Sequence, residues 1–140
     1  MEFGGGKVAI ITGGSRGIGA GLVEAFSKHG YRVIANSRTI TDSPHPEVAS
    51  VAGDIADPTT SERLVSEAVA RFGRIDTLIN KARVFRPKPF VFYTADDCEL
   101  VTSLNVLGHF RITQRVIAEM LAQDSGHQTI GHWPALGSGE

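Results

Sequence analysis

The sequence predicts an α/β protein built on a doubly wound parallel sheet with the strand order 3-2-1-4. Short apolar segments alternate with segments whose apolar residues recur at helical spacing, and this alternation is typical of βαβ units with right-handed crossovers. A glycine-rich loop separates the first apolar segment from the first helical one. We expect helices on both faces of the sheet and a ligand beyond the carboxyl ends of strands one and four, where the winding reverses.

The first three strands are expected early in the chain. The first, residues 7–11, is rich in β-branched residues, as buried parallel strands are. A helix follows the glycine loop and ends at Gly30. The second strand is expected at Arg32–Ser37 and the third at Val48–Ala52. The prolines of the loop 39–47 between these two strands oppose regular structure.

Clear helix signals mark the second half of the chain. Asp57 is expected to cap a helix that ends at Gly73, and a fourth strand is expected at 75–80. A capping box at Thr94 and Asp97 predicts one long helix that continues to Gln123. The apolar positions of this helix are Leu100, Leu104, Leu107, Ile112, Val116, Ile117 and Leu121.

Length and composition exclude several classes of protein. The chain has 140 residues, which suits one domain with one core. Its formal net charge of −1 gives no reason to expect a nucleic acid or an anionic membrane as partner. We expect no membrane helix, no signal sequence and no metal, and a cytoplasmic location. Cys98 is the one cysteine, so an internal disulfide is excluded.

The loop Thr12-Gly13-Gly14-Ser15-Arg16-Gly17-Ile18-Gly19 lies between a strand and a helix, the context that phosphate binding requires. Gly13 allows a sharp turn, and Gly17 allows backbone N–H groups to approach a pyrophosphate. Gly19 allows the helix to pack closely on the strand. The free N–H groups and the positive end of the helix then hold the anion. The alternative is a glycine-rich turn without a ligand.

This glycine spacing, with Thr12 in front, resembles the nucleotide motif of the short-chain dehydrogenase/reductase family. The resemblance covers residues 7–120 and implies an incomplete Rossmann domain at residues 1–126. Residues 127–140 are expected to form an irregular tail with at best a stub of a fifth strand. The family's activity is reversible hydride transfer between NADPH and a carbonyl or alcohol. The implied cofactor contacts within the loop are Gly13, Ser15, Arg16, Gly17, Ile18 and Gly19.

The end of the second strand, Asn36-Ser37-Arg38, favours NADP over NAD. An NAD site carries Asp or Glu there to accept from the ribose 2′-OH. Here no carboxylate repels a 2′-phosphate, and Arg38 can bind one through two N–H groups. Ser37 and Arg38, together with Arg16, resemble the basic sites of NADP-preferring members of the family. The alternative is that the two arginines are solvated surface residues.

Two further segments match the family's cofactor site. The match at Asp54-Ile55 implies that the Asp54 carboxylate meets the adenine amino group and the Ile55 N–H an adenine nitrogen, although Asp54 can also form a turn. The segment Asn80-Lys81-Ala82-Arg83 replaces the family's Asn-Asn-Ala-Gly motif, which lines the cofactor channel. Asn80 and Ala82 match it. Lys81 and Arg83 are expected to obstruct the nicotinamide half, or alternatively to hold more phosphate.

The resemblance reaches only part of the family's catalytic group. Asn105-Val106-Leu107-Gly108 is similar to a family segment whose asparagine holds a water in a proton relay, so Asn105 is the catalytic candidate, with a helix-bending role as the alternative. The helix that carries it often builds a dimer interface in the family, which makes a homodimer plausible. The family's Tyr-x-x-x-Lys pair is absent, because Ala35 and Asp97 follow Tyr31 and Tyr93 at the fourth position.

The sequence therefore predicts an NADP(H)-dependent oxidoreductase of the short-chain dehydrogenase/reductase type, truncated and inactive as this chain. Two alternatives remain open. One is a non-catalytic NADP-binding module, and the other is a structural fragment that binds nothing and leaves the edge of its fourth strand unpaired. The substrate cannot be deduced from these residues.

Overall fold

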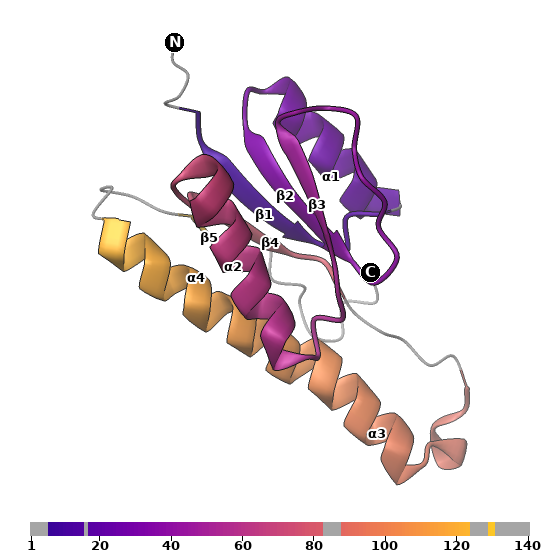
Figure 1. The fold of residues 1–140 in the computed structure, drawn as a ribbon. Coiled ribbons are helices and arrows are strands. Elements are labelled where there is room, and N and C mark those ends of the chain that lie inside the picture. The colour runs from indigo at the N-terminus through magenta and orange to yellow at the C-terminus, as the bar shows by residue number, and fades with distance from the viewer. Residues whose placement is uncertain (1–5, 16, 83–87, 124–128, 131–140) are drawn as a thin grey trace.

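The computed structural model describes residues 6–15, 17–82, 88–123 and 129–130 of the chain. Its strands form one parallel sheet in the order β3-β2-β1-β4-β5, drawn in Figure 1. The elements are β1 (Val8–Thr12), α1 (Gly17–Lys28), β2 (Arg32–Ser37), β3 (Val48–Ala52), α2 (Pro58–Phe72), β4 (Thr77–Asn80), η1 (Phe90–Phe92), α3 (Ala95–Thr102), η2 (Ser103–Gly108), α4 (His109–Gln123) and β5 (Thr129–Ile130). The η1 segment is a 3₁₀ turn, and η2 is a π-helical segment.

The strand order confirms the doubly wound sheet with the order 3-2-1-4. β1 lies at the centre, between β2 and β4, so the glycine loop leaves from the middle of the sheet. β5 is the expected stub, which places Thr129 and Ile130 opposite Thr77 and Leu78 of β4. The rest of the segment 127–140 lies outside the described residues, so its division from the domain at 1–126 stays a prediction.

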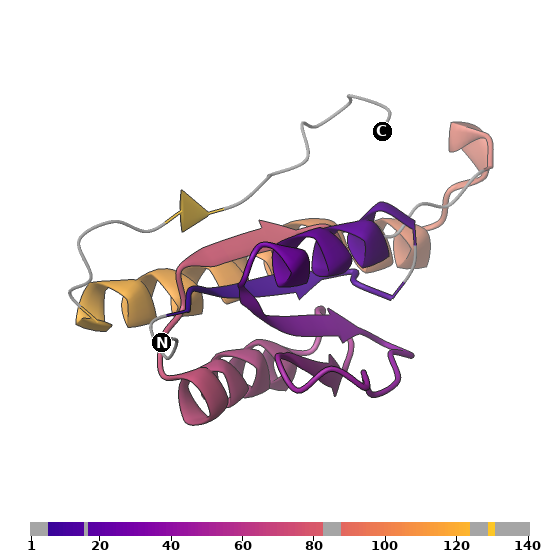
Figure 2. The same ribbon diagram turned by 90° about the horizontal axis from the view of Figure 1, so that it is seen from above.

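Different helices cover the two faces of the sheet, because strand side chains alternate between the faces. Figure 2 shows α1 and α2 on opposite sides of the sheet. On the face covered by α2 and α4, the core contains Val8, Ile10, Ile34, Leu64, Ala68, Leu78, Ile112 and Val116. On the face covered by α1, the core contains Ala9, Ile11, Val33, Ala35, Val48 and Ile79, with Leu22, Val23 and Phe26 packed against it.

The connection between β2 and β3 is a loop, as its prolines predict. In a doubly wound sheet the connection between adjacent parallel strands ordinarily contains a helix that packs on the sheet. Among the described residues, α1 is the one helix that packs on this face. The loop consequently leaves a hollow between itself and α1, which is described with the site below.

The local signals at helix ends are confirmed. Asp57 Oδ1 accepts a hydrogen bond from the Thr59 N–H at 2.9 Å, and Gly73 ends α2 with a φ of +82°. At the start of α3, the Thr94 hydroxyl accepts from the Asp97 N–H at 3.1 Å and the Asp97 carboxylate accepts from the Thr94 N–H at 2.9 Å. Each cap pairs backbone N–H groups that have no partner within their own helix.

β1 and β4 begin later than the sequence predicts, at Val8 and Thr77. Asp76 directly precedes β4, and its side chain is buried beside the start of β1. Its carboxylate accepts from the Val8 N–H at 2.9 Å and from Arg74 Nε at 2.8 Å. Asp76 also pairs with Val8 through its backbone, since its N–H donates to the Val8 carbonyl oxygen at 2.8 Å.

The prediction of one long helix that continues to Gln123 is confirmed, and a π-helical segment lies inside it. α3, the π-helical η2 and α4 follow one another without a gap, and the residues at their junctions, Thr102, Ser103 and His109, have helical backbone angles. Gly108 ends η2 against the loop after β3, where a Cβ on it would lie 3.0 Å from the Ile55 carbonyl oxygen. An extra residue in the turn lets the backbone approach this closely. It also shifts the apolar stripe, so that Leu107 and Leu121, expected in the core, are 40% and 74% exposed.

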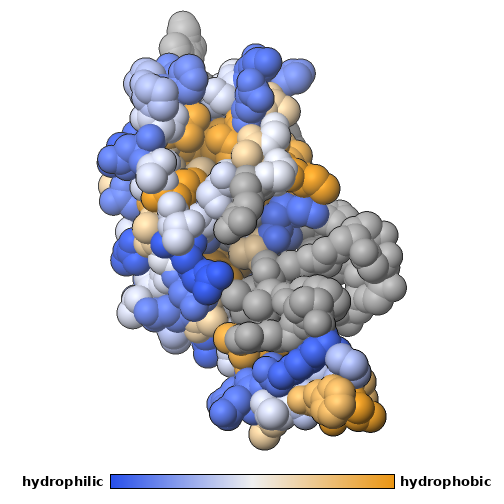
Figure 3. Space-filling model, turned by 90° about the vertical axis from the view of Figure 1, so that its right-hand side faces the viewer, coloured by the Kyte–Doolittle hydropathy of each residue, from blue (hydrophilic) through white to orange (hydrophobic). Residues whose placement is uncertain are grey.

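Apolar side chains also gather on the surface around η1. Phe90, Val91 and Phe92 are exposed, and they form the orange group at the lower end of the molecule in Figure 3. Within the described ranges, none of the helices has both the length and the apolar character needed to cross a bilayer.

Candidate cofactor-binding site

The glycine loop has the geometry that its sequence predicts. Gly13 and Gly17 have φ values of +69° and +60°, a region that side chains other than glycine rarely adopt. A Cβ on Gly19 would lie 1.8 Å from the Gly13 carbonyl oxygen, so α1 packs directly on the loop. A Cβ on Gly17 would meet no atom within 4 Å. The start of α1 therefore faces open space, as an anion site requires.

The Thr12 hydroxyl joins the glycine loop to the segment after β4. The side chain is fully buried, and its Oγ1 accepts from the N–H groups of Lys81 and Ala82 at 2.9 and 3.1 Å. A Cβ on Gly13 would lie 2.9 Å from the Ala82 nitrogen. Backbone segments that are 70 residues apart in sequence thus lie in contact at the reversal of the winding.

The expected phosphate-side residues lie at this edge of the sheet, with different exposure. Ser15 and Ile18 of the loop are exposed, and Arg16 lies outside the described residues. Ser37 is half-buried, with its hydroxyl 3.3 Å from the Thr39 N–H that donates to it. Arg38 is exposed. Its guanidinium therefore faces solvent at the end of β2, where the resemblance places a 2′-phosphate.

Asn36, at the end of β2, is a buried structural residue. Its side chain is 1% exposed, and its Nδ2 donates to the carbonyl oxygens of Val51 at 3.0 Å and Gly53 at 3.1 Å. The sequence placed Asn36 next to the cofactor's ribose but gave no sign of these contacts. Its carbonyl oxygen accepts from the Gly14 N–H at 2.9 Å. Asn36 thus contacts both the glycine loop and the segment after β3.

Asp54 and Ile55 lie where that segment leaves the sheet. Asp54 Oδ1 accepts from the Ala56 N–H at 3.0 Å, which is the turn-forming role that the sequence left open. The Ile55 side chain is 2% exposed and belongs to the core, so only its backbone can face a ligand. Arg111 of α4 donates from Nη1 to the Ala56 carbonyl oxygen at 2.8 Å and holds the turn in place.

The segment after β4 is held from two sides. Asn80 is 1% exposed, and its Nδ2 donates to Thr113 Oγ1 of α4 at 3.2 Å, so this side chain braces the sheet against the helix. Lys81 and Ala82 are half-buried, and Arg83 lies outside the described residues. The Ala82 carbonyl oxygen accepts from His109 Nε2 at 2.7 Å. Sequence reasoning missed His109, because nothing in its neighbours along the chain points to this contact.

Asn105 lies within η2 and is half-buried. The expected catalytic asparagine is therefore carried by the π-helical turn, three residues before Gly108 and its contact with Ile55. Such turns occur frequently at functional sites.

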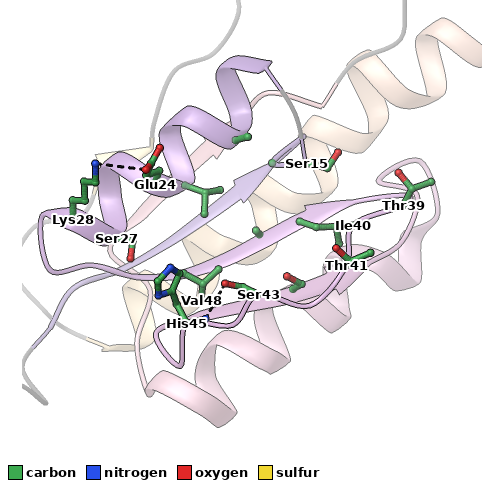
Figure 4. Close-up of a pocket in the computed structure, with 15 residues that line it drawn as sticks. Ser15, Glu24, Ser27, Lys28, Thr39, Ile40, Thr41, Ser43, His45 and Val48 are labelled. Atoms are coloured by element: carbon green, nitrogen blue, oxygen red, sulfur yellow. Dashed lines mark hydrogen bonds and ion pairs between the residues drawn. The ribbon is translucent and has the colours of Figure 1, made fainter.

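A hollow of about 670 Å³ extends the site along α1. It lies over the part of the sheet between α1 and the loop that joins β2 to β3. It begins at Gly14 and Ser15 of the glycine loop and runs toward Lys28 and His45, as Figure 4 shows. Aliphatic side chains such as Val23 form part of its lining. Glu24 and Lys28 at its border form an exposed ion pair with 3.5 Å between Oε2 and Nζ.

Acid should weaken the fold through His109. Burial lowers the pKa of this imidazole from its ordinary 6.5, against a smaller opposite effect of the bond to Ala82. The unfolded chain therefore binds the proton more readily, so the contribution of His109 to the free energy of unfolding falls as the pH drops below 6.5. We expect urea unfolding between pH 5 and 8 to show this slope in the parent.

The matched variant is His109→Gln, whose amide can donate to the same carbonyl without titrating. The difference in unfolding free energy between parent and variant should shrink or reverse as the pH falls. A difference that is independent of pH would contradict the assignment of the slope to His109.

Comparisons with known proteins agree with this geometry. The family model for short chain dehydrogenases matches residues 7–128. The chain is 33% identical over 131 residues to sorbitol dehydrogenase of Cereibacter sphaeroides, covering 89% of this chain and 51% of that protein. It is 32% identical over 130 residues to the FabG 3-oxoacyl-[acyl-carrier-protein] reductase of Thermotoga maritima, covering 86% and 53%. The chain thus spans about half the length of the curated relatives it matches.

Solved structures of similar proteins give the same result. A short-chain dehydrogenase/reductase from Serratia marcescens superposes with a TM-score of 0.74 at 32% identity, over 81% of this chain and 52% of that one. The 3-ketoacyl-(acyl-carrier-protein) reductase of Brucella melitensis, solved in complex with NADH, gives 0.76 at 27% identity, over 84% and 51%. With its glycine loop, strand order and central Thr12 contact, the chain belongs to the short-chain dehydrogenase/reductase family.

Proposed function

We propose that this chain is the cofactor-binding half of an oxidoreductase that transfers hydride between NADP(H) and a carbonyl or alcohol. The observation that carries the proposal is the open face of the glycine loop at the start of α1. Gly17 has a φ of +60° and no atom within 4 Å of a Cβ position, so the backbone N–H groups there are accessible to a diphosphate. The positive end of the α1 dipole adds attraction for the anion.

The end of β2 supports NADP rather than NAD. The residue at this position that could have carried a ribose-binding carboxylate is Asn36, and its side chain is buried. Ser37 and Arg38 follow it at the surface edge, and neither repels a phosphate. An exposed guanidinium can bind a 2′-phosphate through two parallel N–H groups. Arg16, Ser15 and Thr39 complete the polar surroundings that we propose for this group.

We further propose that this chain alone binds the cofactor without useful turnover. Protonation of the forming alkoxide requires a positioned acid, and neither tyrosine is followed by lysine at the fourth position. Tyr31 packs edge-on against Phe26, with ring centroids 4.7 Å apart, on the α1 face of the sheet. Asn105 would serve the proton relay of a complete enzyme.

A homodimer through α4 is proposed from its exposed apolar face. Val106 of η2 and Phe110, Ile117 and Leu121 of α4 are exposed at helical spacing. Phe110 and Ile117 also line a shallow hollow of about 310 Å³ together with Thr113 and Gln114. An exposed apolar stripe of this kind marks a contact surface. Sedimentation velocity of the purified chain distinguishes the monomer from the dimer. We also propose a cytoplasmic location, and the exposed free thiol of Cys98 is compatible with a reducing compartment.

The experiment that tests the proposal is a fluorescence titration with NADPH and NADH. We expect NADPH to bind, and Arg38→Ala to weaken it about 10-fold or more while changing NADH affinity little. Arg71→Ala is the matched control, because Arg71 is an exposed arginine on α2 that pairs with Glu67. Equal losses for both nucleotides in Arg38→Ala would contradict the NADP assignment.

The same titration tests the segment after β4. In the double variant Lys81→Asn, Arg83→Gly, tighter NADPH binding would show that the two cations obstruct the nicotinamide half. An absence of binding before and after these changes would favour the non-binding structural fragment and overturn the proposed function. Binding without oxidation of NADPH by carbonyl compounds would fit the non-catalytic module.

A further inference from the structure

Asn36 makes more contacts between segments than a residue at the end of a strand needs. Its position in the sheet is fixed by pairing with Thr12 of β1 on one side and Val51 of β3 on the other. Its side-chain amide donates to the carbonyl oxygens of Val51 and Gly53 at 3.0 and 3.1 Å. The second of these bonds reaches beyond the end of β3 into the turn that precedes Asp54.

The backbone carbonyl groups of Asn36 and Ser37 contact the same neighbouring segments. The Asn36 carbonyl oxygen accepts from the Gly14 N–H at 2.9 Å, and the Ser37 carbonyl oxygen accepts from the Gly53 N–H at 3.1 Å. Gly14 belongs to the loop that would hold the diphosphate, and Gly53 directly precedes the residue that would meet the adenine. Asn36, together with the Ser37 carbonyl group, thus links two parts of the proposed adenosine site.

The Asn36 amide is buried at a position where an apolar side chain would carry a smaller desolvation cost. Asn36 is 1% exposed, and its Oδ1 has no hydrogen-bond partner among the described residues. A buried acceptor without a partner destabilises the fold. The contribution of the asparagine must therefore come from its two donated bonds. A carboxylate could not replace them, because its oxygen would face two carbonyl oxygens.

We propose that Asn36 is a positioning residue for the adenosine half of the cofactor, acting through Gly53 and Asp54 without touching the nucleotide. The inference rests on the proposed function, because it assigns the adenosine site to this edge of the sheet. It also restricts cofactor specificity. An acidic residue at position 36 disrupts the turn before Asp54, so a change of preference toward NAD has to be built at Ser37, which is half-buried.

The test uses adenosine 2′,5′-bisphosphate, which carries only the adenosine half, titrated calorimetrically into the full chain. We expect Asn36→Asp to weaken its binding at least about 10-fold. Asn36→Ser, whose hydroxyl can donate to one of the two carbonyls, should give an intermediate loss and serves if Asn36→Asp does not fold. Thr77→Ser is the control, since Thr77 is also a buried polar residue of the sheet but lies at the start of β4, opposite Ala9 and away from the carboxyl ends of the strands.

A second measurement does not depend on the nucleotide. Amide hydrogen exchange at residues 53–56 should be faster in Asn36→Ser than in the parent, and unchanged in Thr77→Ser. The inference would be overturned if the parent binds adenosine 2′,5′-bisphosphate and the Asn36 variants bind it with the same affinity and show the same exchange rates as the parent. A parent that binds no adenosine 2′,5′-bisphosphate would overturn the proposed function instead, and the exchange rates would then decide alone whether Asn36 holds the turn.

Discussion

Gly19→Ala should strongly destabilise the protein, because it separates α1 from the glycine loop. Gly21→Ala, two residues further along the same helix, should stabilise the protein. A Cβ on Gly19 would lie 1.8 Å from the Gly13 carbonyl oxygen and 2.8 Å from its carbonyl carbon. Both atoms belong to the backbone of the glycine loop, so relief requires moving α1 away from β1. We expect a loss of about 3 kcal/mol or more in unfolding free energy, a large share of the stability of a domain this size.

The control differs only in its surroundings. Gly21 also lies inside α1, is exposed, and has no atom within 4 Å of its Cβ position. Alanine there should gain about 0.5–1 kcal/mol from helix propensity. Urea unfolding followed by circular dichroism measures both variants, and NADPH titration reports the loop. Equal effects of the two substitutions would show that α1 does not pack on the glycine loop as described.

Thr12→Val should cost about 2–4 kcal/mol, although it exchanges side chains of nearly equal volume. The Thr12 hydroxyl accepts from the N–H groups of Lys81 and Ala82, and the side chain is fully buried. Valine would leave both donors without this partner, at a cost of about 1–3 kcal/mol each. Because Lys81 and Ala82 are only half-buried, the two costs should lie in the lower part of that range. The segment after β4 should then move away from Gly13.

Thr12→Ser separates the hydroxyl from the methyl group. Serine keeps the acceptor and removes one methyl, so its loss should stay near 1 kcal/mol. Urea unfolding of the two variants side by side gives the comparison. If serine proved as damaging as valine, the methyl contact rather than the two hydrogen bonds would be the source of stability.

The fold was predictable where its signals are local. Asp57, Gly73 and the Thr94–Asp97 capping box act on backbone groups within one helical turn, so their effect can be deduced from neighbouring residues. The glycine spacing likewise encodes a conformation, because φ values above zero at Gly13 and Gly17 need no distant partner. These features also fixed the strand order, since the position of the loop identifies the central strand.

The site was less predictable because its contacts are distant in sequence. Asn36 bonds to carbonyl groups 15 and 17 residues away, and His109 to one that is 27 residues away. From the sequence, Asn36 belongs to a surface motif and His109 is one of five scattered histidines. The π-helical turn at Asn105 has no composition signal either, because the approach of Gly108 to Ile55 requires it. Sequence periodicity therefore could not predict which residues of this helix face the core beyond the π-helical turn.

The central position of β1 has a consequence for synthesis on the ribosome. β1 emerges first, but one of its two neighbours, β4, follows much later, since the bond between Val8 and Asp76 spans 68 residues. At ordinary translation rates this interval lasts roughly 3 to 14 s. Throughout it, a strand whose residues Val8 to Ile11 are fully shielded in the finished protein has one edge without its partner. Nascent-chain aggregation and chaperone capture should therefore be concentrated in the period before residue 80 leaves the exit tunnel.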